Sequence, residues 1–388
     1  MRRLLFIIIA GLLLTLMLPA SGGWAQSPPK EKVAKLQEEI NRANDFRENV
    51  ERRALNETVR KFGDEYAKAK TDAEREKVVA RARRFLQERL KVLKKAKDEA
   101  FQRIIREVDK LYKIDTRNVK GEPTFSQDVQ GEGECYPDGR VRLGPRAFTS
   151  PGWVASTKKH EATHADQAAE GRWPRGAVER HDAEIEAYGR EITSADTMSL
   201  TDAERAEVQR RLHNHLRWKK AALINEIEAA RASMDTDKQR KELDKIAGKI
   251  RDVQKLEEKG DEEAAMEKKN DAIKELNDLI KKAKGKAKDT LEKLKDHVED
   301  LKKAQIFVIK ADTIENLRDA RDAATTTPAQ KEEINKIIGK LKKIIDLEKK
   351  GDEKEALKIK KDALKEINDL LKDAKGETKI TWKKPRKG

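Results

Sequence analysis

The chain has 388 residues, of which 41% are charged and only 4% aromatic, and its formal net charge at pH 7 is +15. This composition argues against one large globular core and favours helical hairpins and coiled coils. Cys135 is the only cysteine, which excludes an intrachain disulfide. The positive charge favours acidic surfaces or polyanions as partners without identifying one.

Residues 1–25 have the features of a secretory signal peptide. Arg2 and Arg3 precede an almost unbroken apolar run over residues 4–18, and small residues follow it. A run of about 15 residues is short for a membrane span of about 20. We therefore expect cleavage after residue 25, no transmembrane segment in the mature protein, and a secreted or periplasmic location.

Residues 30–113 are expected to form an antiparallel helical hairpin, because apolar residues recur there at helical spacing. The first helix loses its pattern near Ala69. Thr71 and Glu74 then have the spacing of a capping box, which predicts the start of a second helix.

Residues 114–220 differ in composition, with glycines, prolines and tryptophans gathered together. Short β-strands are expected at 124–126, 134–136 and 140–143, with a turn at 137–139. Ser150 and Pro151 then suit the N-cap and the first residue of a helix. This is the one segment that is expected to be compactly globular.

That helix carries the sequence His160-Glu161-Ala162-Thr163-His164. Residues four apart share a helix face, so His160 and His164 can offer imidazole nitrogens to one metal ion. Glu161, next to the first histidine, can act as a general base on a metal-bound water. The pattern therefore predicts a zinc site in which Glu161 is the catalytic residue.

The motif and its surroundings resemble the zincin metallopeptidases, in particular the gluzincin arrangement. There a glutamate on a following helix completes the zinc site, and Glu184, twenty residues after His164, matches it within Glu184-x-x-Ala187-Tyr188. The resemblance implies Zn²⁺ bound by His160, His164 and Glu184, and hydrolysis of peptide bonds by a zinc-activated water.

Two other glutamates compete for the role of third ligand. Glu186 is the main rival of Glu184, and the two point about 200° apart on a helix, so only one can face the metal. Glu170 stands where a metzincin places its third ligand. That family requires glycine at position 167, where this chain has Gln167.

The donor for the reaction's oxyanion is left open by the sequence. Tyr188, His181 and His213 are candidates, and none has a spacing that singles it out. His297 lies in a strongly charged helical segment, where we expect it to be solvent-exposed.

Residues 236–376 contain an internal duplication with an offset of 91 residues throughout. For example, residues 271–279 match 362–370. Each copy has a Gly-Asp pair between two amphipathic runs, which predicts a helix–turn–helix hairpin. The tail at residues 377–388 is basic and can contact an anionic cell surface, but no recognisable nucleic-acid module accompanies it.

The sequence thus predicts a mainly α protein, in which helical hairpins flank a small α+β zincin-like domain. Its predicted function is that of an exported zinc metallopeptidase with a protein or peptide substrate. The alternative is an exported helical binding or scaffold protein whose zincin-like segment is inactive or structural.

Overall fold

The computed structural model describes residues 28–323, 326–349, 352, 355–360, 362–363 and 365–367, and these are mostly helical with one small β-sheet. This confirms the expectation of a mainly α protein. The signal peptide expected at residues 1–25 and the tail expected at 377–388 lie outside the described residues. In the part of the chain that is described, no helix is both long and apolar enough to cross a membrane.

The regular elements follow one another in an order that places the strands between two groups of helices. They are α2 (Lys30–Lys68), α3 (Asp72–Tyr112), β1 (Thr124–Phe125), β2 (Gly133–Cys135), β3 (Val141–Leu143), α4 (Pro151–Ala169), α5 (Ala177–Ser194), α6 (Asp202–Ala230), α7 (Asp237–Glu258), α8 (Glu262–Ile280), α9 (Gly285–Asp322) and α10 (Pro328–Lys349), with short 3₁₀ helices at Pro145–Ala147 and Arg231–Ser233. They divide into two compact units. One comprises the described parts of Gln26–Trp173 and Ser194–Glu204, and the other those of Pro174–Thr193 and Arg205–Gly388.

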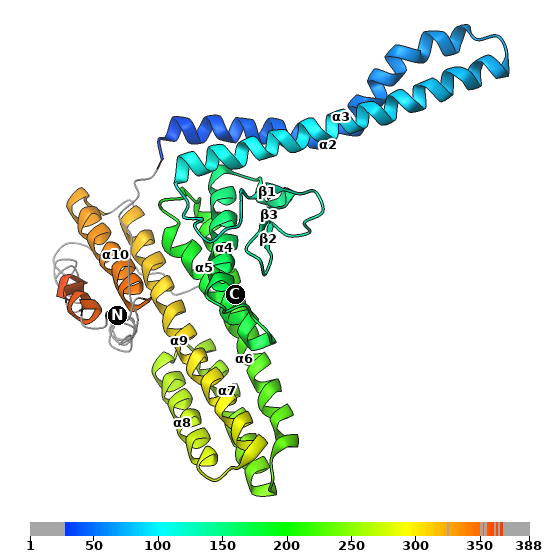
Figure 1. The fold of residues 1–388 in the computed structure, drawn as a ribbon. Helices are drawn as coiled ribbons and strands as arrows, with labels where there is room; N and C mark the ends of the chain where they lie inside the picture. Colours follow the sequence, from blue (N-terminus) through cyan, green and yellow to red (C-terminus); the bar gives the residue numbers. More distant parts are fainter. Residues whose placement is uncertain are drawn as a thin grey trace. The chain divides into compact units, whose positions relative to one another are not determined.

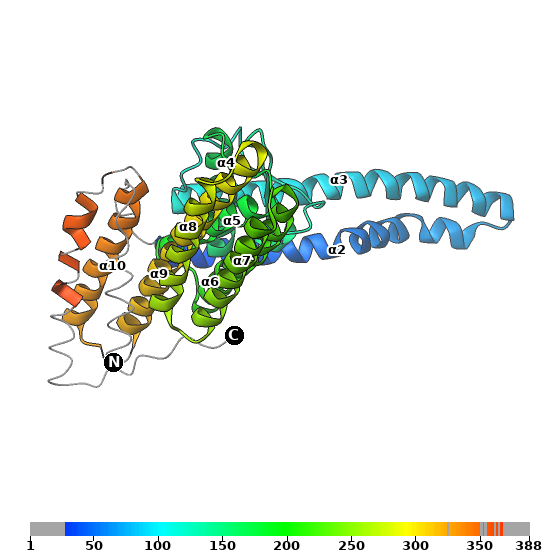
Figure 2. The ribbon, with the colours of Figure 1, turned by 90° about the horizontal axis from the view of Figure 1, so that it is seen from below.

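In the first unit, α2 and α3 lie side by side as a long hairpin (Figures 1 and 2). The expected capping box is present: Glu74 N–H donates to Thr71 Oγ1 at 3.2 Å, and Thr71 N–H donates to the Glu74 carboxylate at 3.1 Å. An ion pair between Glu57 and Arg89 links the two helices along their length, with Nη2 and Oε1 3.1 Å apart. Local signals and cross-helix pairs therefore both specify the hairpin.

The three strands form one sheet in the order β1-β3-β2. β1 is parallel to β3, with Thr124 opposite Arg142, and β2 is antiparallel to β3, with Glu134 opposite Arg142. The expected turn is confirmed, because Tyr136 N–H donates to Arg140 O at 2.9 Å. β2 is consequently an edge strand, and it packs against α4.

Helix α4 begins as the sequence predicted. Ser150 Oγ accepts a hydrogen bond of 2.9 Å from Trp153 N–H, and Pro151 is the first helical residue. Most of the helix is buried, and it also contacts α3 and β3. Lys158 is fully buried and pairs with Asp109 of α3. These contacts give the motif histidines a firmly packed support.

The second unit contains the described residues of the region 236–376, for which the sequence predicts a duplication. Gly260 has φ +73°, which favours glycine, and Asp261 then caps α8 by accepting from Ala264 N–H. In the second copy, Asp352 accepts from Glu355 N–H at 3.2 Å. Cross-helix ion pairs are repeated as well: Lys249 lies 2.8 Å from Glu275, and Lys340 lies 2.7 Å from Glu366.

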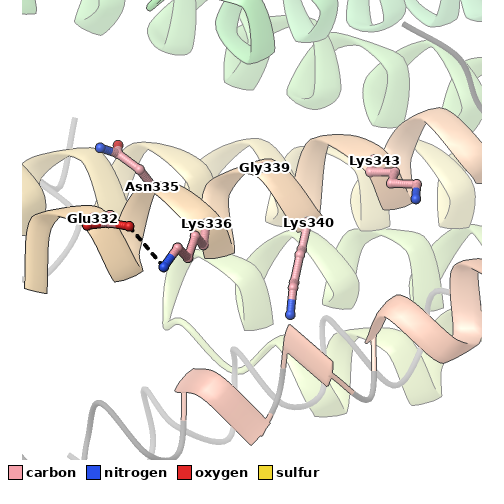
Figure 3. Close-up of a pocket in the computed structure, with 6 residues that line it drawn as sticks. All are labelled: Glu332, Asn335, Lys336, Gly339, Lys340 and Lys343. Atoms are coloured by element: carbon pink, nitrogen blue, oxygen red, sulfur yellow. Dashed lines mark ion pairs between the residues drawn. The ribbon is translucent and has the colours of Figure 1, made fainter. Parts of the chain in front are cut away.

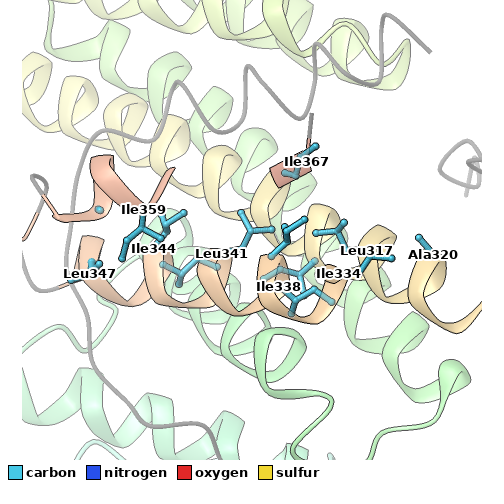
Figure 4. Close-up of a cluster of buried hydrophobic side chains, with 13 residues drawn as sticks. Leu317, Ala320, Ile334, Ile338, Leu341, Ile344, Leu347, Ile359 and Ile367 are labelled. Carbon is cyan, nitrogen blue, oxygen red and sulfur yellow. The ribbon is translucent and has the colours of Figure 1, made fainter. Parts of the chain in front are cut away.

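Each copy also has a carboxylate between two lysines, half-buried in the first copy and buried in the second. Glu257 pairs with Lys269, at 2.8 Å, and with Lys220 of α6. In the second copy Glu348 pairs with Lys360, at 2.6 Å, and with Lys310 of α9. α9, α10 and the residues Ala356, Ile359 and Ile367 also form an apolar cluster (Figure 4). The repeated unit thus includes a preceding helix besides the predicted hairpin.

Candidate metal centre

The two motif histidines lie one turn apart on α4, and their ring nitrogens converge. Nε2 of His160 and Nε2 of His164 are 3.1 Å apart. Two imidazole nitrogens bound tetrahedrally to one zinc ion, each at about 2.1 Å, are about 3.4 Å apart. His160 is buried and His164 is half-buried. The separation is therefore close to that of two ligands on one metal ion.

Gln167 orients the His164 ring. Its Oε1 lies 2.8 Å from Nδ1 of His164, so the amide oxygen accepts the proton carried by that nitrogen. Nε2 is then unprotonated, which is the form that binds a metal. The sequence interpretation missed this role, although a spacing of three residues on one helix is the signal that could have found it.

Glu161 is 6% exposed and lies against the edge strand β2. A Cβ atom placed on Gly133 would be only 2.7 Å from Oε1 of Glu161. Glycine at this position therefore lets the strand backbone pass close to the carboxylate. The arrangement puts a buried acid, adjacent in sequence to His160, against the edge strand.

Cys135 also lies in β2, close to the motif. Burial is the main cause that raises the pKa of the thiol to about 12; the negative charges of Glu161 and Asp138 contribute to the shift, and His160 opposes it. Cys135 does not belong to the set of residues in the described part of the chain whose ligand atoms group together.

Glu184 of α5 is the acid that groups with the two histidines. The ligand atoms of His160, His164 and Glu184 lie within 4.8 Å of one another, and in the described part of the chain no other set of three such residues does so. Glu186 instead pairs with Arg190 at 2.6 Å. Glu170 pairs with the exposed Arg172, its carboxylate 2.7 Å from Nε. The donor set of two imidazoles and one carboxylate suits zinc and leaves a fourth position for water.

The histidines and the tyrosine considered as oxyanion donors take other partners. His181 of α5 and His215 of α6 approach each other, with their Nδ1 atoms 3.2 Å apart. The ring of Tyr188 lies 5.4 Å from that of His215, centroid to centroid. His213 pairs with Asp312 at 3.0 Å.

The expectation that His297 is solvent-exposed is wrong. The residue is only 6% exposed, and its Nδ1 lies 2.6 Å from the Glu226 carboxylate. Its Nε2 lies 3.9 Å from Glu179. Helical packing of α5, α6 and α9 brings these groups together, which the charged local sequence did not reveal.

Helix α10 also has a groove of about 450 Å³, and none of the residues that line it is a histidine (Figure 3). The residues drawn there are Glu332, Asn335, Lys336, Gly339, Lys340 and Lys343. Lys336 pairs with Glu332 at 3.0 Å, and Lys340 pairs with Glu366. Because these cations are balanced by neighbouring acids, we assign the groove no part in the chemistry.

Comparisons with known proteins give this chain no family. No family model, no curated protein and no solved structure matches it. The resemblance to zincins therefore rests on the motif itself, and the function has to be argued from the side chains.

Proposed function

We propose that the chain is an exported zinc-dependent metallopeptidase. The observation that carries this proposal is the convergence of Nε2 of His160 and Nε2 of His164, 3.1 Å apart on a buried helix, beside the buried carboxylate of Glu161. Zinc bound there supplies a Lewis acid that polarises a carbonyl and lowers the pKa of water towards about 7. The grouping of Glu184 with the histidines supports it as the third ligand.

Each residue has a distinct role in this proposal. His160, His164 and Glu184 hold the ion, and Gln167 keeps the metal-binding nitrogen of His164 unprotonated. Glu161 accepts the proton of the attacking water and passes it to the leaving amine. Its position against β2 keeps it out of bulk solvent.

The edge strand supports a peptide as the substrate. β2 is paired only with β3, and within the described residues its other edge has no strand partner. An extended peptide can add to such an edge through main-chain hydrogen bonds. Because Gly133 places no side chain over Glu161, a peptide on β2 brings its backbone near the proposed base.

The metal content of the purified protein tests the ligand set. We expect about one zinc per chain, lost in His160→Ala and sharply reduced in Glu184→Ala. Glu186→Ala is the matched control, since Glu186 lies on the same helix and pairs with Arg190. Absence of zinc after the metal is supplied, or equal loss in the control, would contradict the proposed site.

The catalytic role is tested separately with Glu161→Gln. This variant keeps the volume of the side chain but removes the base, so it should bind zinc normally and lose hydrolysis of unfolded casein by at least about 100-fold. Unchanged turnover would refute the role of Glu161.

A binding or scaffold function is the second candidate, and one observation favours it. On α2, Leu55 is 52% exposed, Val59 is 60% exposed and Tyr66 is 48% exposed. Their spacing places them along one helix face, which is a common feature of surfaces that meet a partner. A protein that contains zinc but fails to cleave any tested peptide would favour this function.

A further inference from the structure

A second pair of histidines lies on α5 and α6, within one compact unit. The Nδ1 atoms of His181 and His215 are 3.2 Å apart, and the ring centroids are 5.3 Å apart. The corresponding nitrogen separation in the His160–His164 pair is 3.1 Å. The two pairs therefore present nearly the same distance between potential ligand atoms.

This coincidence is informative because histidine is scarce. The chain has only six histidines among 388 residues, and four of them form these two pairs. A distance of 3.2 Å is at the long end for a hydrogen bond between two nitrogens. It falls within the range expected for two imidazole ligands on one divalent ion, about 2.9 Å for square-planar and about 3.4 Å for tetrahedral geometry.

The surroundings of the pair suit a cation. Both imidazoles are half-buried, and the negative charge of Glu184 acts on His181 against the positive charges of Arg180 and Lys219. Lys219, which is buried on α6, is paired with Asp182. Desolvation by burial is the main cause that lowers the pKa of His181.

We propose that His181 and His215 form a second metal site that binds a divalent transition-metal ion through their Nδ1 atoms. Water or an oxygen of a bound ligand completes the coordination. The site does not depend on the proposed peptidase function, because neither histidine belongs to the His160–His164–Glu184 set. Imidazole ligands bind Cu²⁺ most tightly among the common divalent metals, so Cu²⁺ is the probe for the site.

Trp218 provides a direct readout. Its ring centroid lies 4.9 Å from that of His215 and 5.9 Å from that of His181, and the side chain is half exposed. A paramagnetic Cu²⁺ ion at this distance quenches indole fluorescence. The signal reports occupancy of the site without any measurement of peptide hydrolysis.

The experiment uses the full chain with the double substitution His160→Ala and His164→Ala, which removes the first pair. Titration with Cu²⁺ should show one equivalent bound and quenching of tryptophan fluorescence. His215→Gln or His181→Gln in this background should weaken binding by at least about ten-fold. Trp218→Phe should reduce the quenching of tryptophan fluorescence, but the protein should still bind one equivalent of Cu²⁺.

His213→Gln is the matched control, because His213 lies on the same helix but pairs with Asp312. This variant should bind Cu²⁺ as the parent does. Circular dichroism checks that each variant keeps its helical content. Two results would show that the pair is held together by a hydrogen bond alone. One is the absence of a bound Cu²⁺ equivalent in the folded parent, and the other is binding in the His181→Gln and His215→Gln variants that is as tight as in the parent.

Discussion

The protonation of single imidazole rings decides whether the candidate centre can bind a metal. In the α4 pair, the hydrogen bond between Gln167 and Nδ1 of His164 determines which ring nitrogen carries the proton, and it leaves Nε2 unprotonated. Gln167 is itself 1% exposed, so packing restricts its side chain to few rotamers. The amide therefore acts on the ion through the ring it orients.

A substitution of Gln167 tests this positioning role. Gln167→Ala should weaken zinc binding by about 10- to 100-fold, because the ring loses the acceptor that fixes its tautomer. Gln167→Glu should restore or strengthen binding, since a carboxylate accepts the same proton. Competition with a chromophoric chelator measures both affinities, and equal affinities in all three proteins would exclude the role.

The contact between β2 and α4 determines how closely a peptide backbone can approach the proposed base. Gly133 permits this contact because any Cβ atom there would collide with the carboxylate of Glu161 at 2.7 Å. Gly131, two residues earlier, has a nearest neighbour at 3.6 Å from an added Cβ, which is ordinary van der Waals contact.

We therefore predict that Gly133→Ala lowers peptide hydrolysis by at least about ten-fold while zinc remains bound. The added methyl group displaces either the strand or the Glu161 side chain, whereas the histidines keep their places on α4. Gly131→Ala should retain most of the activity. Metal analysis and casein hydrolysis on the same samples separate the two effects, and full activity in Gly133→Ala would contradict the close approach.

The sequence predicted correctly those helix starts that depend on contacts between residues only a few positions apart. The caps at Thr71 and Ser150 depend on contacts three residues along the chain, and both are present. The pairing of His181 with His215, 34 residues apart, was not predicted. It depends on how α5 packs on α6, and spacing along one helix contains no information about that packing.

Across the whole molecule, the duplication also extends beyond what the sequence pattern indicated. Lys269 pairs with Glu257 and Lys360 pairs with Glu348, and these two lysines are 91 residues apart, as the repeat requires. Lys220 and Lys310, the second lysines of the triads, are 90 residues apart and lie on α6 and α9. Their offset of 90 residues differs by one from the offset of 91 within the hairpins. A sequence comparison at a constant offset of 91 therefore does not include α6 and α9 in the repeat.

Each triad buries two ammonium groups with one carboxylate, so a net positive charge is removed from water. Burial lowers the pKa of Lys310 to about 8, and the neighbouring Glu348 opposes the shift. Unfolding returns this pKa to 10.5. Between these two values the unfolded chain binds more protons than the folded chain. The contribution of Lys310 to the free energy of unfolding therefore rises with pH across this window, by at most about 3 kcal/mol.

Urea unfolding followed by circular dichroism between pH 7.5 and 10 measures this contribution. Lys310→Met should be more stable than the natural chain near pH 7.5, because it removes a buried charge, and its advantage should shrink as the pH rises. Lys343→Met is the control, since Lys343 is exposed on α10 and should leave the pH dependence unchanged. Parallel pH curves for the natural chain and Lys310→Met would mean that Lys310 keeps its proton in the folded state throughout this range, held by Glu348 more strongly than burial disfavours it.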